Sequence, residues 1–345
     1  MAPQARLAIY KACWEDGCYD TGTVAAMEQT IVAMEQTFAD SIEIISISIG
    51  SPETPFTDDN RAIAAFRAIE KGVFFSALVG NDEPYPSSLG NVAPYITTVG
   101  ASNINRDFPA SVVLGNQEMY RGTSTYSRLD DTTLQWSLPL VYVSTNTSTS
   151  YCVPGSLDPK LVKDKIMVGD QIMSYKEVAR EGGAGKIGAN DERYGSEQCI
   201  TNPNILSAIS VSLTTREKIK DYIKRTGNNA TATMNLKGLM VVRKETTAPI
   251  VASFSSRGPS EAYRQILRLD MISPGLNILE AYAGEFPYNI LSGTSMSCPH
   301  VSGIATLIKA IHPTWSPAAI KSVLMTSPYV TNNADQPIKD SNTIK

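Results

Sequence analysis

The sequence predicts an α/β fold in which parallel strands alternate with helices. An isoleucine-rich run at residues 42–49, followed by a glycine, is typical of a strand in a parallel sheet. A helical pattern follows at residues 58–71, and an apolar run at residues 73–78 predicts another strand. Because strand, helix and strand alternate, we expect crossover connections between neighbouring parallel strands.

The helix expected at residues 58–71 has an apolar stripe. Ile63, Phe66 and Ile69 recur at intervals of three residues, which places them on one side of the helix. We therefore expect these three side chains to face the core. Gly72 follows directly and is the expected C-terminal cap.

Upstream of this unit, residues 5–13 predict a strand whose apolar face carries Leu7 and Ile9. A helix is expected at residues 23–39, where the pentapeptide AMEQT occurs twice, seven residues apart. Such a repeat lengthens a helix by about 10 Å and rotates its apolar face by only about 20°. Further strands are expected at residues 95–100, 251–255, 269–272 and 288–291.

Composition describes an ordinary globular protein. The 345 residues are 42% hydrophobic and 19% charged, with a net charge of −4. That charge, without a basic stripe, gives no reason to expect a nucleic-acid partner. No apolar run reaches the length of a membrane span, and residues 1–10 do not have the pattern of a signal peptide.

A Gly-Thr-Ser turn at residues 293–295 opens a helix that runs into the apolar segment 304–311. Ser295 would lie at the positive end of the helix dipole beside free backbone N–H groups, a setting that favours a nucleophile and the oxyanion it creates. We expect Pro299 to be tolerated as part of the first helical turn. Apolar residues on almost every face predict that the helix is buried.

The longer stretch GTSMSCPHVSG at residues 293–303 resembles the active-site serine signature of the subtilisin-like serine proteases (peptidase S8), and its second half resembles the plant, cucumisin-type branch. Matches also occur in family order at residues 46–50 (SISIG), 80–81 (GN), 254–259 (FSSRGP) and 272–275 (ISPG). The resemblance implies a subtilisin-like parallel sheet flanked by helices and a secreted plant hydrolase. It also implies a peptide or protein substrate and no metal or other cofactor.

The resemblance assigns roles to individual residues. Ser295 would be the nucleophile, and Asn81, which by itself is typical of a turn, would be the oxyanion-hole asparagine. An amide can donate to a developing oxyanion without titrating. Substrate contacts would come from Ser48, Ile49, Gly50, Val79 and Gly80.

The sequence departs from the family pattern around this asparagine. Leu78 and Val79 stand where relatives have small residues, and Asp82 and Glu83 replace a Ser-Gly pair. The bulkier side chains are expected to narrow the specificity pocket. The two carboxylates are expected to oppose negative charge near Asn81.

A serine protease of this type also needs a general base and an acid that orients it. The chain has two histidines, His300 on the nucleophile helix and His312 at its end, and we interpret both as structural. The resemblance places the catalytic Asp and His upstream of the segment that matches residues 2–6, which makes this chain N-terminally truncated relative to the family. We therefore expect a serine endopeptidase site that is inactive in this chain alone. The alternative is a non-catalytic peptide-binding or regulatory remnant.

The expected domain organisation has three parts. Residues 1–130 would be the first part of the catalytic domain, and residues 236–345 its second part with the nucleophile helix. Residues 131–235 resemble the protease-associated (PA) domain inserted in plant subtilases, with a strand at 165–168 and a helix at 175–182. The resemblance implies that this insertion selects substrates or forms a homodimer contact. An irregular surface insertion is the alternative.

The five cysteines leave two interpretations open. Cys13 can pair with Cys18, and Cys152 with Cys199, which would leave Cys298 as a buried thiol beside the nucleophile; alternatively all five are reduced. Glycosylation sequons occur at residues 146–148 and 229–231. Only the family resemblance favours an extracellular, apoplastic location.

Overall fold

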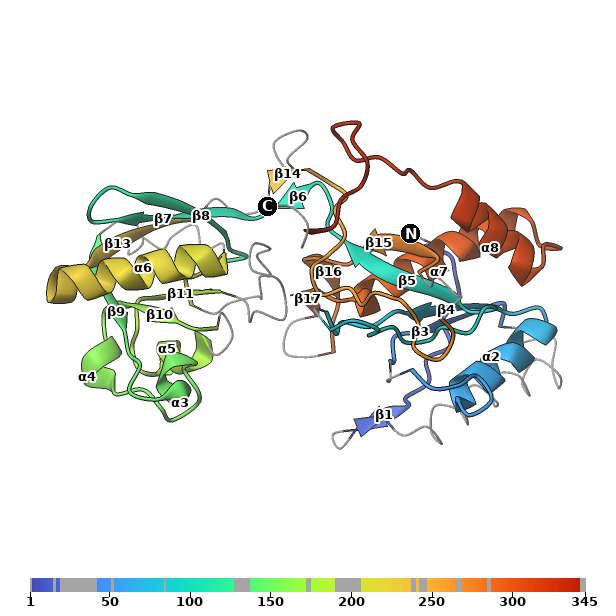
Figure 1. Ribbon diagram of the computed structural model, residues 1–345, viewed down its shortest axis with the longest axis horizontal. Helices are drawn as coiled ribbons and strands as arrows, with labels where there is room; N and C mark the ends of the chain where they lie inside the picture. The colour runs from blue at the N-terminus through green and yellow to red at the C-terminus, as the bar shows by residue number, and fades with distance from the viewer. Residues whose placement is uncertain are drawn as a thin grey trace. The chain divides into compact units, whose positions relative to one another are not determined.

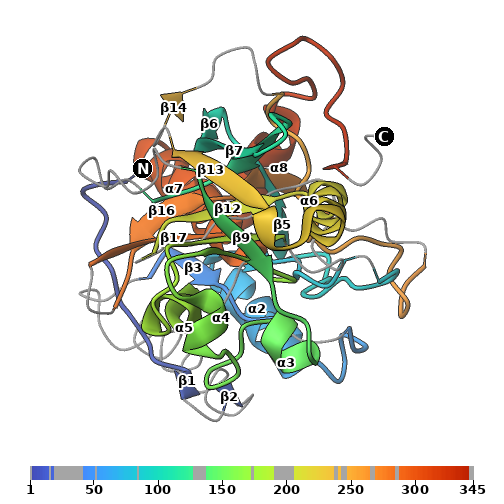
Figure 2. The same ribbon diagram turned by 90° about the vertical axis from the view of Figure 1, so that its left-hand side faces the viewer.

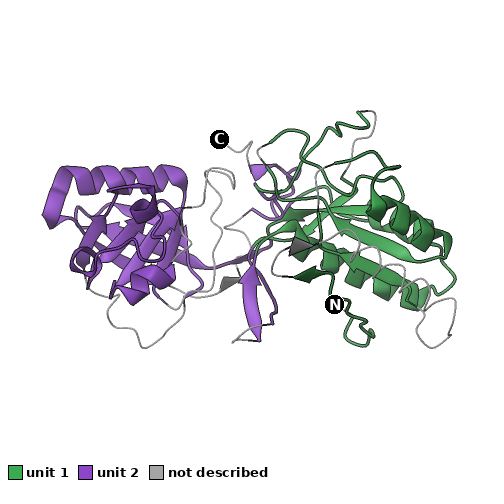
Figure 3. Ribbon diagram, turned by 90° about the horizontal axis from the view of Figure 1, so that it is seen from below, with its two compact units in different colours: residues 1–103, 254–276, 292–331 green, residues 104–253, 277–291, 332–345 purple. Residues whose placement is uncertain are grey.

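The computed structural model describes residues 2–14, 17–18, 42–50, 53–83, 85–126, 137–171, 175–189, 206–236, 240–241, 247–264, 269–283 and 287–341. The chain divides into two compact units (Figure 3). The sheet unit comprises residues 1–103, 254–276 and 292–331, and the barrel unit comprises residues 104–253, 277–291 and 332–345. The helix expected at residues 23–39 and its repeat lie outside the described residues.

The sheet unit is built on four parallel strands in the order β15-β5-β4-β3 (Figure 1). Their bounds are β3 Ile44–Ile47, β4 Phe74–Leu78, β5 Thr97–Ser102 and β15 Met271–Pro274. The helices are α2 Asn60–Glu70, α7 Thr294–Ile311 and α8 Pro317–Thr326. This arrangement confirms the α/β fold class.

Neighbouring residues of β4 face opposite sides of the sheet, because side chains alternate along a strand. Phe74 packs with Val301 of α7 and Ile320 of α8, whereas Phe75 packs with Ala65 of α2. Both phenylalanines are almost fully buried. Helices therefore cover both faces of β4, which explains why its five residues are all buried.

Helix α2 packs differently from the sequence prediction. Its buried residues are Arg61 and four alanines, while Ile63 and Phe66 are 38% and 48% exposed, and Ile69 is half-buried. The inward orientation predicted for Ile63 and Phe66 is therefore wrong. Alanines let the helix approach the sheet closely, so the small residues rather than the large ones form the inner face. Gly72 has φ +83° directly after the C-cap residue, as its predicted role requires.

The strand predicted at residues 5–13 is not formed. Only β1, Cys13–Trp14, pairs with β2, Gly17–Cys18, and Leu7 and Ile9 are 83% and 88% exposed. A strand needs a neighbour to pair with, and no described residue pairs with the edge of β3 that faces away from β4. Alternation of apolar residues alone therefore did not determine the structure of this segment.

Helix α8 begins as its sequence predicts. The Ser316 hydroxyl accepts a hydrogen bond from the Ala319 N–H, and Pro317 occupies the first helical position. Trp315 and Ile320, on either side of the cap, both pack in the cluster around Phe74. In the part of the chain that the structure describes, no helix combines the length and hydrophobicity needed to cross a bilayer.

The barrel unit contains a closed barrel of seven strands in the order β10-β11-β12-β8-β7-β13-β9, with α6 packed against β9 and β11 (Figure 2). Strands β9 to β12 pair in parallel, and the other barrel pairs are antiparallel. The bounds are β7 Pro109–Leu114, β8 Met119–Thr123, β9 Leu138–Tyr142, β10 Ile166–Gly169, β11 Gly185–Ala189, β12 Ala208–Val211 and β13 Thr231–Leu236. The helices are α3 Thr147–Ser150, α4 Pro159–Val162, α5 Tyr175–Arg180, α6 Leu213–Thr226 and the 3-10 helix η3 Gly227–Asn229.

This barrel corrects the predicted boundary between residues 130 and 131. Strands β7 and β8 precede residue 131, yet they close the barrel by pairing with β13 and β12. The boundary fails because these strands find their partners about a hundred residues downstream. The ordered core of this unit also excludes an irregular surface insertion, whereas the resemblance to a PA domain stays a prediction.

Two further two-stranded ladders occur among the described residues, besides β1–β2. Strand β6, Arg106–Asp107, pairs with β14, Met240–Val241, and β16, Ile278–Ala281, pairs with β17, Tyr288–Leu291. The strand predicted at residues 251–255 is reduced to a single bridge between Val251 and Asp340.

The cysteines follow neither interpretation fully. Cys13 is disulfide-bonded, so the interpretation with five reduced thiols is wrong. In the β1–β2 ladder the backbone of Cys13 lies opposite that of Cys18, and the pairing of these two cysteines stays a prediction. Cys152 is free and buried, which contradicts its pairing with Cys199, a residue outside the described part. Cys298 is the buried thiol that was predicted.

Cys152 lies beside a buried lysine in the barrel unit. The Lys186 side chain on β11 is fully buried, and a Cβ placed on Gly169 would lie 3.1 Å from Lys186 Cε and 3.3 Å from Cys152 Sγ. Burial lowers the pKa of the Lys186 ammonium, against the effect of its hydrogen bond with Cys152. Burial likewise raises the pKa of the Cys152 thiol, and Lys186 opposes that shift.

Lys186→Met is expected to flatten the rise of barrel stability with pH that occurs below the ordinary lysine pKa of 10.5. The unfolded chain holds the Lys186 proton up to its ordinary pKa of 10.5, whereas the folded chain releases it earlier, so stability rises with pH in this window. The check is the urea midpoint of the β10 and β11 amide signals at several pH values. Cys152→Ala is the control, because a thiol with a raised pKa reduces stability only above its ordinary value of 9.0. An unchanged slope in Lys186→Met would contradict the expectation.

Candidate active site

The candidate site is assembled at the start of α7. Gly293 caps this helix without a side chain, and the first helical N–H groups therefore need other acceptors. Thr294 donates its N–H to Asn81 Oδ1 at 2.8 Å, and the Met296 N–H bonds to the Gly293 carbonyl at 3.1 Å. Between them, the Ser295 N–H has no acceptor among the described residues. It is thus a free donor at the positive end of a helix of 18 residues.

Asn81 is oriented by the oxygen of its amide group. Its Oδ1 accepts from both the N–H and the hydroxyl of Thr294, at 2.8 and 3.0 Å. With the oxygen held in this way, the amide nitrogen points away from Thr294, and no described residue accepts from it. Asn81 is exposed, so this nitrogen can donate to a ligand.

The two free donors border one small space beside Gly293. A Cβ built on Gly293 would lie 3.4 Å from Asn81 Nδ2 and 3.7 Å from the Ser295 nitrogen. A side chain at residue 293 would therefore lie beside both nitrogens and beside Met296 Sδ, which is also 3.4 Å away. Two convergent donors in such a space are the arrangement that stabilises an oxyanion.

The Ser295 side chain is half-buried, and its hydroxyl bonds to no other described residue. Both histidines of the chain are engaged elsewhere. His300 Nδ1 lies 3.0 Å from the Met296 carbonyl oxygen of its own helix, and His312 stacks on Trp315 at 4.0 Å. Neither imidazole forms a hydrogen bond with the Ser295 hydroxyl in this structure.

Pro299 lies inside α7 and not in its first turn, which corrects the prediction. Because proline has no N–H, the carbonyl of Ser295 loses its usual helical donor. The Ser48 hydroxyl replaces it and donates to the Ser295 carbonyl at 3.0 Å. Ser48, predicted to contact substrate, therefore also fixes the backbone of the predicted nucleophile.

The burial predicted for α7 is also only partly right. Its inner face, including Ser297, Cys298, Val301 and Ala305, is buried against the sheet strands. By contrast, Ile304, Leu307 and Ile311 are 44%, 43% and 73% exposed. A helix that covers one face of a sheet keeps its other side exposed, whatever residues occur there.

The segment after β3 is accessible where contact with a substrate was predicted. Ser48 and Gly50 are exposed, and Ile49 is half-buried. Sequence reasoning missed Asn91, whose amide nitrogen donates to the carbonyls of Ile49 at 3.1 Å and Leu78 at 2.9 Å. This buried residue ties the ends of β3 and β4 together, and no local pattern indicated it.

The predicted contribution of Val79 to substrate binding is not supported. Its side chain is fully buried with Leu89 and Val92, and its N–H and carbonyl both take part in backbone bonds, to Val99 and Gly90. Leu78 is also buried, with its Cδ1 3.0 Å from a Cβ built on Gly50. Both large residues therefore fill the core beneath the site.

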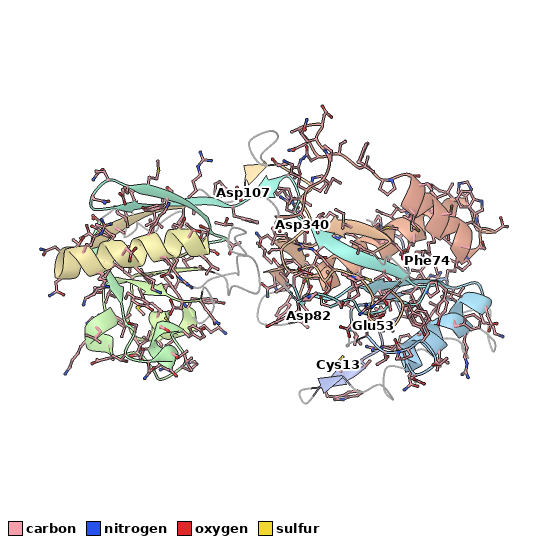
Figure 4. All side chains as sticks on the ribbon, viewed as in Figure 1. Cys13, Glu53, Phe74, Asp82, Asp107 and Asp340 are labelled. Atoms are coloured by element: carbon pink, nitrogen blue, oxygen red, sulfur yellow. The ribbon has the colours of Figure 1, made fainter. Side chains whose placement is uncertain are left out.

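The two carboxylates behave differently from the prediction. Glu83 is buried and pairs with Arg257 at 3.1 Å, so its charge is compensated by a cation. Asp82 is exposed beyond the carboxyl end of β4 (Figure 4) and remains accessible to solvent. The predicted repulsion therefore applies to Asp82 only, and solvent screens it.

Cys298 lies under the helix start and not in the site. Its thiol is fully buried, 3.4 Å from the Ser76 hydroxyl and 3.7 Å from that of Ser46. Burial raises the pKa of this thiol. No cluster of three or more His, Cys, Asp or Glu side chains suited to a metal occurs in the described ranges.

Comparison with known proteins identifies the chain. Residues 1–342 match the model of the subtilase family, Peptidase_S8. Three similar proteins of Arabidopsis thaliana, Subtilisin-like protease SBT1.5, SBT1.3 and SBT1.7, are 42%, 41% and 40% identical over 99% of this chain. The chain spans about half the length of these relatives, 46%, 45% and 46%.

The comparison with solved structures also matches Sphericase, with 17% identity and a TM-score of 0.45, and S41 Psychrophilic Protease, with 16% identity and a TM-score of 0.47. The matches cover 94% and 98% of this chain, and 60% and 64% of the solved chains. The family model and the plant relatives both extend over nearly the whole sequence, including the Ser295 and Asn81 segments. The chain therefore belongs to the subtilase family, peptidase S8.

Proposed function

We propose that this chain carries the nucleophile and oxyanion-hole part of a serine endopeptidase site. When a base takes the hydroxyl proton, Ser295 attacks the carbonyl carbon of a peptide bond, and the Asn81 amide and the Ser295 N–H hold the oxygen as it becomes negative. The C–N bond then breaks, the amine leaves with the proton, and Ser295 carries the acyl group. The observation that carries the proposal is the pair of free donors bordering the space beside Gly293. The exposed segment at Ser48 and Gly50 binds the peptide backbone.

Neither histidine bonds to the Ser295 hydroxyl in the described part of the chain, so we propose that residues 1–345 alone are not a competent protease. Both histidines are held elsewhere. Loss of triad members costs on the order of 10⁶ in turnover in subtilisin, and the oxyanion hole and binding retain about 10³ to 10⁴ over water. Because the Ser295 hydroxyl bonds to no other described residue, an added base can reach it.

Fluorophosphonate labelling of residues 1–345 tests both parts of this proposal. We expect negligible labelling of Ser295 alone and a clear increase when free imidazole supplies the missing base. Ser295→Ala should abolish the labelling, and Ser292→Ala, three residues earlier, is the matched control. Stoichiometric labelling without imidazole would show that the chain is competent. No labelling even with imidazole would contradict the role of Ser295.

The engaged histidines also favour a second function, a non-catalytic peptide-binding or regulatory protein. In that case peptides bind the segment at Ser48 and Gly50, and imidazole does not promote labelling.

We further propose that the barrel unit is PA-like and forms a homodimer contact, which sedimentation of the chain tests. By its family, we place the protein outside the cell, in the apoplast.

A further inference from the structure

The position of Asn81 depends on more than its own side chain. Thr294 holds only the oxygen end of the amide, and Asn81 is exposed on the turn that follows β4. An exposed turn residue keeps a fixed direction only if the peptide groups on both sides of it are fixed. The bonds of these two peptide groups therefore decide where the amide nitrogen points.

One buried residue, Ser256, makes both bonds. Its N–H donates to the Gly80 carbonyl at 3.0 Å, and its hydroxyl oxygen accepts from the Asp82 N–H at 3.0 Å. Ser256 is fully buried, so water does not compete for either bond. The two bonds hold the chain immediately before and immediately after Asn81.

Gly80 explains how Ser256 comes so close. Gly80 has φ +119°, and a Cβ there would lie 2.6 Å from the Ser256 hydroxyl oxygen and 3.3 Å from its Cβ. Residue 80 must therefore lack a side chain for Ser256 to reach Asp82. This gives Gly80 a supporting role, distinct from its predicted contact with substrate.

The segment that contains Ser256 is itself firmly held. The Phe254 carbonyl accepts from the Glu83 N–H, the Ser255 hydroxyl accepts from the Ala101 N–H at 3.1 Å, and the Arg257 carbonyl accepts from the Ser88 N–H at 3.2 Å. These bonds extend on both sides of Ser256 and tie it to β5 and to the loop after β4. Ser256 thus links the turn at Gly80–Asp82 to a segment that is bonded to the sheet.

We propose that Ser256 is a positioning residue for Asn81, which holds the peptide groups on both sides of it so that the amide nitrogen stays directed at the oxyanion space. The inference rests on the proposed function, because only that function gives the direction of the Asn81 amide nitrogen a catalytic role. The direction itself is a property of the folded chain and can be measured without catalysis.

The first test uses peptide binding. Acetyl-Ala-Ala-Pro-Phe with a free carboxylate places a charged oxygen at the donors, and the same peptide with a terminal amide does not. The wild-type chain should prefer the carboxylate, and Asn81→Leu should reduce that preference about tenfold. Ser256→Ala should reduce it by about three- to tenfold. Ser76→Ala, which removes an equally buried hydroxyl of β4 whose side-chain contact is with the Cys298 thiol, should leave it unchanged.

The second test follows the Asn81 side-chain amide by NMR, with its signal assigned by loss in Asn81→Asp. Ser256→Ala should lower the order parameter of this amide, and Ser76→Ala should not. Wild-type order in Ser256→Ala would overturn the inference, and so would an equal loss in both variants, which would indicate a general loosening of the fold. If the wild-type chain binds neither peptide, the proposed function loses its support, while the amide signal still decides the role of Ser256.

Discussion

Gly275→Ala is expected to destabilise the sheet unit by about 3 kcal/mol and to displace the first turns of α7. A Cβ on Gly275 would lie 2.1 Å from the Ser297 hydroxyl oxygen, 2.7 Å from the Ala101 Cβ and 2.7 Å from the Gly293 carbonyl oxygen. The last two atoms belong to the backbone or lie next to it, so no rotamer change removes the overlap. Urea unfolding of the chain measures the loss.

The displaced segment is the one that carries the site. The Gly275 carbonyl accepts from the Gly293 N–H at 2.8 Å, and Ser273 and Ser297 exchange hydroxyl-to-carbonyl bonds at 2.9 and 3.1 Å. Gly258→Ala is the matched control, because its added methyl group would meet Leu89 Cδ1 at an ordinary 3.4 Å. Equal urea midpoints for the two variants would contradict the expectation.

Arg257→Met is expected to cost about 3 kcal/mol, since it removes the guanidinium group that pairs with the buried Glu83 carboxylate. The Glu83 side chain is only 7% exposed and that of Arg257 is 27% exposed, which places the loss at the lower end for a broken buried pair. Methionine retains much of the length of the arginine side chain, so most of the apolar packing survives. The measurement is again the urea midpoint.

The double variant Glu83→Gln, Arg257→Met separates charge from packing. Without the carboxylate there is no unpaired buried charge, so we expect the double variant to be more stable than Arg257→Met alone. If removing Glu83 as well lowers the stability further, the loss came from packing around Arg257 and not from the stranded charge.

The parts of the fold that were predicted correctly are those that local chemistry determines. Gly72 and Ser316 mark helix ends because each satisfies backbone groups within a few residues of itself. The strands that became β3 and β4 were recognisable because a strand between two helical layers is mostly apolar. The α/β class follows from these elements and their order.

The failures concern partners that are distant in the sequence. Leu7 and Ile9 alternate as a strand does, but no described neighbour pairs with them. Ile63 and Phe66 do lie on one side of α2, as their spacing predicts. That side is exposed, because the alanines pack closely against the sheet instead. Periodicity locates a face, but tertiary packing decides which face is buried.

The candidate site shows the same division. The positions of Ser295 and Asn81 were marked by motifs, and the structure brings Asn81 to the helix start through Thr294. Asn91 was not predicted because no sequence pattern marked it. Ser256 lies in the FSSRGP match at residues 254–259, but no role was predicted for it because its hydrogen bonds reach residues 80 and 82, far away in the chain. Glu83 was misjudged for this reason, since its cation lies 174 positions later.

The bond between the Ser48 hydroxyl and the Ser295 carbonyl has a mechanical consequence. The strand end proposed to grip a peptide and the residue proposed to attack it share one link, which exists because Pro299 left that carbonyl without its own partner. A bound peptide that displaces Ser48 would therefore also displace the Ser295 backbone, because the two are hydrogen-bonded. Pro299 therefore couples the segment proposed to bind peptide to the residue proposed as nucleophile.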